Sequence, residues 1–177
     1  MKKITSSLAV VCLTVILFAS NLMASGNAWA APAAAPSFSG VTIDGKPFSS
    51  ASLKGKAYIV NFFATWCPPC RGEIPDMVVL QKAYAAKGFT FIGIALDDSS
   101  APVKNLIRKD AINYPVIMGN KAIVSKFNPY IDGGINGIPS SFVVDSSGNL
   151  TQALVGAQSK EAFERIINSA IGRKAGK

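Results

Sequence analysis

A run of β-branched and aromatic residues directly before a pair of cysteines most constrains how this 177-residue chain can fold. Residues 57–63, with sequence AYIVNFF, predict a strand that is buried on both faces, as in the middle of a mostly parallel sheet. Three residues later the sequence reads CPPC at 67–70, and a helical pattern continues from 68 to about 87. The sequence therefore predicts a strand whose end delivers Cys67 to the start of a helix.

Similar patterns along the rest of the chain alternate between strands and helices. Further strands are predicted at 89–96, 116–118, 141–145 and 150–155, and further helices at 101–110, 122–127 and 159–172. The turn SSGN between the last two strands predicts an antiparallel hairpin, so the sheet is expected to be mixed. Alternating residues on both sides of Asp44-Gly45 predict a second, N-terminal β-hairpin. Together these elements predict an α/β fold with a mixed central sheet flanked by helices.

The first 30 residues have the pattern of a secretory signal. Two lysines precede an apolar stretch at 8–22, and the small-residue site Ala28-Trp29-Ala30 follows it. The apolar stretch is shorter than the ~20 residues that a membrane span needs, so cleavage is favoured over a retained anchor. We expect a signal peptide at 1–30, a flexible Ala/Pro segment at 31–37, one domain at 38–172 and a basic tail at 173–177. The protein is expected to be periplasmic or otherwise extracytoplasmic.

Composition excludes several classes of function. The net charge is +8, but no run of lysines or arginines is interleaved with aromatic residues, so we expect no nucleic-acid partner. The chain has no histidine, which excludes Cys–His nucleophilic pairs and His-ligated zinc, copper or haem. Cys12 lies in the signal peptide, so the exported chain keeps Cys67 and Cys70 as its cysteines.

The spacing of Cys67 and Cys70 is compatible with a structural staple, a metal clip or a redox pair. A disulfide that closes so small a ring contributes about 2 kcal/mol in the chain-entropy formula, and a zinc clip would need two carboxylate ligands, so we expect no metal. At a helix N-terminus a Cys67 thiolate would be stabilised, which favours Cys67 as the exposed attacking sulfur and Cys70 as the less exposed resolving thiol. Pro68 and Pro69 stiffen the first helical turn, and Trp66 is expected to shape an apolar rim.

Two longer stretches carry a resemblance to a known family. VNFFATWCPPCRGEIP and GINGIPSSFVVDSSGNL resemble the extracytoplasmic thioredoxin-like proteins of the TlpA/ResA/CcmG type. The resemblance implies a thioredoxin-like fold in which residues 101–118 form a central helix-strand insertion. It also implies that Pro139 follows a cis peptide bond and faces the disulfide, where the backbone of Ile138 pairs with the substrate chain. With Trp66 and Pro68, these residues make up the expected substrate-binding surface.

Glu73 is a candidate proton relay. It lies three residues after Cys70 on the same helix face, where a carboxylate can exchange protons with the resolving thiol, although an ordinary solvated glutamate would show the same spacing. The resemblance favours the relay, because ResA-like proteins carry an acidic residue at this position and burial near sulfur would raise its pKa. Asn61 takes the position of the buried acid of cytoplasmic thioredoxins and cannot titrate.

The resemblance implies a thiol-disulfide oxidoreductase that reduces protein disulfides, with the Cys67/Cys70 disulfide as its redox group and no other cofactor. Expected partners are a disulfide-containing protein, with apocytochrome c among the family's targets, and a membrane protein that donates reducing thiols; we expect a monomer. Two alternatives stay open. A peroxiredoxin-like peroxidase would need a threonine where the chain has Ala64. A non-enzymatic thiol- or copper-binding module would have Met77 and Met118 as its further soft ligands.

Overall fold

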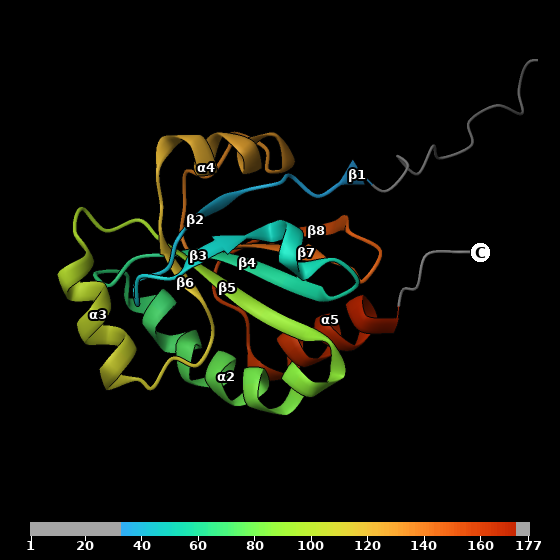
Figure 1. The fold of residues 1–177 in the computed structure, drawn as a ribbon, viewed down its shortest axis with the longest axis horizontal. Helices are drawn as coiled ribbons and strands as arrows, with labels where there is room; N and C mark the ends of the chain where they lie inside the picture. Colours follow the sequence, from blue (N-terminus) through green and yellow to red (C-terminus); the bar gives the residue numbers. More distant parts are fainter. Residues whose placement is uncertain (1–32, 173–177) are drawn as a thin grey trace, which may run out of the picture. The chain divides into compact units, whose positions relative to one another are not determined.

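The computed structural model describes residues 33–172, and within them the central element is a six-stranded mixed sheet (Figure 1). Its strands are β1 (Ala33–Ala34), β4 (Ala57–Phe63), β5 (Phe89–Ala95), β6 (Val116–Met118), β7 (Ser140–Val144) and β8 (Asn149–Val155). Their order across the sheet is β1-β8-β7-β4-β5-β6. Strands β4, β5 and β6 are parallel, whereas β7 is antiparallel to both β4 and β8, and β8 to β1. The predicted mixed α/β sheet is confirmed.

Helices cover both faces of this sheet. In the described residues they are α2 (Pro68–Tyr84), α3 (Ser100–Lys109), α4 (Lys121–Phe127) and α5 (Lys160–Gly172), with short 3-10 helices at Ser50–Leu53, Ala85–Lys87 and Asn128–Tyr130. Helices α2 and α5 lie on one face and α4 on the opposite face (Figure 1). None of the helices within residues 33–172 is both long and apolar enough to span a membrane.

Strand β4 is buried along its whole length and separates two apolar cores. Its side chains alternate: Ile59 and Phe63 pack with the residues of α2, α3 and α5, whereas Val60 and Phe62 pack with those of α4. Burying each of these large apolar side chains contributes roughly 1.5–3 kcal/mol, so the strand is held firmly from both sides. The segment that follows β4 and carries the cysteines therefore starts from a rigid support.

The predicted N-terminal hairpin is present as β2 (Ser39–Val41) and β3 (Pro47–Ser49). Its turn contains Gly45 at φ 87°, a left-handed conformation that glycine adopts without steric penalty. The hairpin docks on the edge of the large sheet, where the Ile43 N–H donates to the Val116 carbonyl at 2.8 Å. It thereby covers the edge strand β6, whose backbone groups would otherwise be open to pairing.

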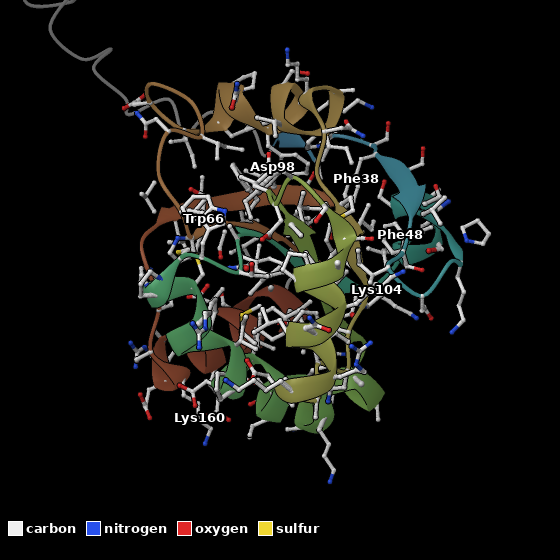
Figure 2. All side chains as sticks on the ribbon, turned by 90° about the vertical axis from the view of Figure 1, so that its left-hand side faces the viewer. Phe38, Phe48, Trp66, Asp98, Lys104 and Lys160 are labelled. Atoms are coloured by element: carbon white, nitrogen blue, oxygen red, sulfur yellow. A yellow bond between two sulfur atoms is a disulfide. The ribbon has the colours of Figure 1, made fainter. Side chains whose placement is uncertain are left out.

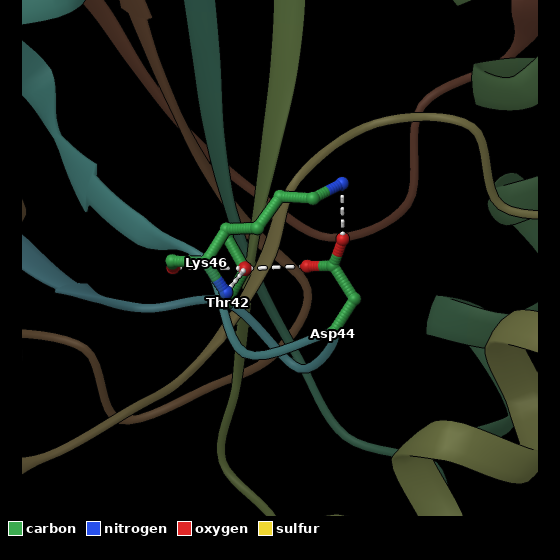
Figure 3. A network of polar contacts seen from close by, with 3 residues as sticks. All are labelled: Thr42, Asp44 and Lys46. Atoms are coloured by element: carbon green, nitrogen blue, oxygen red, sulfur yellow. Dashed lines mark hydrogen bonds and ion pairs between the residues drawn. The ribbon is translucent and has the colours of Figure 1, made fainter.

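The turn of this hairpin carries a small polar network at the surface (Figure 3). The Thr42 hydroxyl donates to Asp44, and the Lys46 ammonium lies 2.7 Å from the Asp44 carboxylate. The side chains of this ion pair are 79% and 60% exposed for Lys46 and Asp44. Solvent screens such a pair, so it fixes the turn locally and adds little to global stability.

Residues 33–37 differ from the flexible segment that we expected at 31–37, whose first two residues lie outside the described part of the chain. Ala33 and Ala34 form β1, which pairs with Leu150 and Asn149 at the outer edge of β8. Small side chains without charge allow this pairing, so the chain is tied to the sheet before the hairpin begins. The predicted signal peptide at 1–30 and basic tail at 173–177 lie outside the described residues.

Candidate active site

The two cysteines form a disulfide at the start of α2. The Cys67 and Cys70 sulfurs are bonded at 2.12 Å, and the Cα atoms are 5.3 Å apart. Cys67 is the N-cap residue of α2, and its sulfur accepts the Cys70 N–H at 3.3 Å. Pro68 occupies the first helical position, where the missing N–H of proline costs nothing. Because Pro68 and Pro69 have no N–H, the Cys70 N–H is the donor of this first turn that reaches the Cys67 sulfur, and it favours a thiolate there.

The two sulfurs differ in access, but less than the sequence suggested. Cys67 was expected to be exposed, yet it is 4% exposed, and Cys70 is fully buried. Cys67 is the more exposed of the two cysteines, as predicted, but its exposed fraction is far smaller than expected. Trp66 is 68% exposed (Figure 2), and Pro68 is exposed as well. A large apolar surface therefore lies directly beside the disulfide.

The loop before β7 faces Cys67. The Ile138–Pro139 peptide bond is cis, as the resemblance implied. The Ile138 carbonyl oxygen lies 3.7 Å from the Cys67 sulfur, and the Gly156 N–H donates to the Pro139 carbonyl at 2.8 Å. Residues distant in sequence, Trp66–Pro68 and Ile138–Pro139, thus meet around one sulfur atom.

Glu73 is buried one turn after Cys70 and is 2% exposed. Its two carboxylate oxygens accept hydrogen bonds from the Asn61 side-chain amide at 2.7 Å and from the Gln158 N–H at 3.0 Å. Burial raises the pKa of Glu73 to about 7, against the lowering effect of these two hydrogen bonds. The solvated alternative is therefore wrong, and the carboxyl group can hold or release a proton near neutral pH.

Asn61 has a partner on each side, which the sequence did not predict. The same amide nitrogen that donates to Glu73 also donates to the Ser141 hydroxyl at 3.0 Å, and all three side chains are buried. Asn61 and Ser141 are directly paired residues of β4 and β7. The non-titrating amide thus holds the titrating carboxylate in place, and strand pairing between distant segments was the missing information.

Asp97 is a further polar residue near the site whose role was not foreseen. Ser99 is the N-cap residue of α3 and makes no side-chain hydrogen bond to the helix. The Asp97 carboxylate accepts the Thr65 N–H at 3.1 Å and the Thr65 hydroxyl. Phe63 of β4 and Ala95 of β5 are register partners in the parallel pair of strands. Thr65 lies two positions after Phe63, and Asp97 lies two positions after Ala95. This equal offset can be recognised only when the register of the two strands is known.

The described residues contain no group of three or more cysteine, aspartate or glutamate side chains arranged to hold a metal ion.

Comparison with known proteins relates the whole domain to thiol chemistry. The sequence matches the family described as Redoxin over residues 30–171. The thiol-disulfide oxidoreductase ResA of Bacillus thuringiensis (strain Al Hakam) is 32% identical over 134 residues, which cover 75% of this chain and 74% of ResA. The thioredoxin-like protein YneN of Bacillus subtilis (strain 168) is 31% identical over 140 residues, or 76% of either chain. A crystal structure of a thioredoxin-family thiol:disulfide interchange protein from Chlorobium tepidum TLS is 62% identical, with a TM-score of 0.78, covering 81% of this chain and 99% of that one.

Proposed function

Because the chain belongs to the Redoxin family and is a thiol-disulfide oxidoreductase, we propose that it reduces protein disulfides outside the cytoplasm through Cys67 and Cys70. The observation that carries the proposal is the placement of the disulfide at the N-terminus of α2. Cys67 is the less buried of the two sulfurs and lies opposite the Ile138 carbonyl. A helix N-terminus stabilises the thiolate that attack on a substrate disulfide requires.

Two exchange steps would transfer the electrons. The Cys67 thiolate attacks one sulfur of the substrate disulfide, forms a mixed disulfide and releases one substrate thiolate, which takes up a proton from water. Cys70 then loses its proton and attacks the Cys67 sulfur, which releases the second substrate sulfur as a thiolate that takes up a proton from water. Two electrons pass from the cysteine pair to the substrate, and the pair ends as the disulfide of the structure. A thiol donor protein in the membrane would return the two electrons by the same chemistry.

Glu73 would accept the proton that Cys70 loses in the second step. The carboxyl group lies one helical turn after Cys70, and its pKa of about 7 lets it accept a proton near neutral pH and release it again. Glu73→Gln is expected to slow the resolving step about 100-fold, within the usual range for general base catalysis. Unchanged resolving rates and thiol titrations in this variant would remove Glu73 from the mechanism.

The substrate would bind across the surface that surrounds Cys67. Trp66 and Pro68 offer exposed apolar area on one side of the sulfur, and Ile138–Pro139 offers backbone on the other. A peptide lying between them could pair with the Ile138 backbone as an added strand. Such a surface accepts many sequences, because main-chain pairing reads no particular side chain.

The compartment and the partners extend this proposal. The signal-like pattern of residues 1–30 supports export to the periplasm or an equivalent space, and ResA is among the relatives. On this basis the substrates include apocytochrome c, whose cysteines must be reduced before haem attachment. The protein would act as a monomer, since each chain carries both cysteines.

Trapping the mixed disulfide tests the proposal. Reduced Cys70→Ala protein, mixed with apocytochrome c that carries a disulfide, should accumulate a covalent complex through Cys67. The matched Cys67→Ala variant should form none, and a complex formed through Cys70 would contradict the assigned roles. The reduction potential tests the direction: a value near −270 mV or lower agrees with a reductant, whereas a value near −120 mV would make the protein a disulfide donor.

A further inference from the structure

A second buried carboxylate, Asp97, holds the segment that leads to the disulfide. We propose that Asp97 is a positioning residue for thiol-disulfide exchange: it fixes the turn before Cys67 and places a negative charge near the Cys67 sulfur. The inference rests on the proposed attack by Cys67. Nothing in the disulfide, the cis-proline loop or the Glu73 network requires an acid at this position.

The hydrogen bonds of Asp97 extend the pairing of β4 and β5 beyond the two strands. The Leu96 N–H donates to the Phe63 carbonyl at 2.8 Å, which is the last backbone bond between these segments. One step further, the Asp97 carboxylate receives the Thr65 N–H at 3.1 and 3.3 Å and also the Thr65 hydroxyl. A side chain thus takes the place of a backbone acceptor where the chain turns away from the sheet.

The same turn is closed from within, because the Cys67 N–H donates to the Ala64 carbonyl at 3.2 Å. With Thr65 fixed to Asp97, the chain from the end of β4 to Cys67 has anchors at both ends. The rotation of Trp66 and the direction of the Cys67 sulfur therefore depend on the Asp97 contact. Loss of that contact would make the position of the Cys67 sulfur less well defined, although both cysteines would still be present.

The charge of Asp97 is balanced by hydrogen-bond donors rather than by a cation. Asp97 is 8% exposed, and within residues 33–172 no lysine or arginine lies at ion-pair distance from its carboxylate. Two exposed charged side chains, Asp98 and Lys121, line the same surface cavity as Asp97. In the first two turns of α2 the charged residues are Arg71 and Glu73.

This charge opposes the effect of the helix N-terminus on Cys67. One residue, Trp66, separates Thr65 from Cys67, so their Cα atoms are at most about 7.6 Å apart. A negative charge held at Thr65 disfavours a thiolate on Cys67, whereas the Cys70 N–H and the dipole of α2 favour it. Asp97 is therefore expected to keep the pKa of the Cys67 thiol higher than the helix alone would set it, and to make the pair more reducing.

The pH dependence of Cys67 alkylation tests both parts of the inference. In reduced full-length protein, Asp97→Asn keeps an oxygen for the Thr65 N–H and removes the charge, so the midpoint of the alkylation curve should fall by roughly half to one pH unit. The glutathione equilibrium should shift toward the reduced pair. Asp97→Ala should lower turnover with a protein disulfide further than Asp97→Asn. Asp98→Asn, an exposed neighbour, is the matched control and should leave all three readouts unchanged.

A midpoint in Asp97→Asn equal to that of the wild type would overturn the inference. Thr65→Val gives a second test if the Asp97 variants fold poorly, since it removes one donor and keeps the carboxylate; its midpoint should rise, and no shift would count against Asp97. Peptide mapping of the alkylated protein shows whether the role of Asp97 or the proposed attack by Cys67 has failed the test. Modification of Cys70 first would refute the attacking role of Cys67, whereas modification of Cys67 with an unchanged curve would refute the role of Asp97.

Discussion

The buried network around Glu73 and the exposed network of the hairpin turn place the same chemical group in opposite surroundings. Glu73 accepts hydrogen bonds from Asn61 and Gln158, and burial raises its pKa to about 7. Asp44 pairs with Lys46 at the surface, and that contact holds the pKa of Asp44 below its ordinary value. The pKa values of these two hydrogen-bonded carboxylates are therefore shifted in opposite directions.

The difference shows that desolvation, and not the number of hydrogen bonds, decides the sign of the shift here. Both carboxylates accept hydrogen bonds, and in both cases these bonds lower the pKa. For the buried Glu73, the effect of desolvation on the pKa is larger than the effect of the hydrogen bonds. For Asp44 at the hairpin, the hydrogen bonds have the larger effect. A group that exchanges protons near neutral pH thus arises next to the disulfide, while the surface carboxylate stays ionised.

The largest expected effect is a pH dependence of stability that Glu73 alone introduces. The pKa of about 7 in the folded state lies above the ordinary pKa of 4.5, so between these values the folded state binds more protons than the unfolded state. Stability should therefore fall as pH rises, by about 2–3 kcal/mol between pH 5 and 8. Urea unfolding of the oxidised protein at several pH values measures this slope.

Glu73→Gln is the control for this slope, since the amide keeps the size of the side chain and cannot titrate. The difference between the two pH profiles isolates Glu73 from the other carboxylates. Parallel profiles for wild type and Glu73→Gln would mean that the burial of the carboxylate has little effect on its pKa.

A smaller effect is expected from Asn61→Leu, which removes the amide that joins Glu73 to Ser141. Two buried acceptors lose their donor, so the free energy of unfolding should fall by about 1–3 kcal/mol. Loss of a hydrogen bond to the charged form should also move the titration of Glu73 upward in pH. Ser141→Ala is the matched control, because it removes one contact of Asn61 and leaves the other. A titration that does not move in Asn61→Leu would separate Asn61 from the function of Glu73.

The sequence predicted most of the fold because each element has a strong local signal. The buried run of β4 and the glycine at φ 82° that ends the α2 region, Gly88, depend on neighbouring residues alone. The cysteine pair is equally local, and the cis bond before Pro139 came from a resemblance to a family. In contrast, 31–37 was expected to be flexible, since pairing of two alanines with β8 leaves no pattern in the residues themselves.

Missed features of the site share one property: they join segments far apart in sequence. The partners of Glu73 come from β4 and from the loop before α5, which are separated from it by 12 and 85 positions. Asp97 and Thr65 are 32 positions apart. The low exposure of Cys67 likewise depends on how closely the loop with Ile138 approaches it. Such contacts need the strand order and register, which no local pattern specifies.

The smallest effect is expected at the exposed network. Asp44→Asn removes the negative charge that pairs with Lys46 and keeps a residue type that suits the turn before Gly45. Because the ion pair is open to solvent and salt, its loss should leave the urea midpoint unchanged within error at physiological ionic strength. The pKa of Lys46, which the contact with Asp44 raises, should return toward its ordinary value. A clear loss of stability would show that the hairpin turn, and with it the docking of Ile43 on β6, depends on this charge. The exposed carboxylate would then contribute to stability as the buried network does.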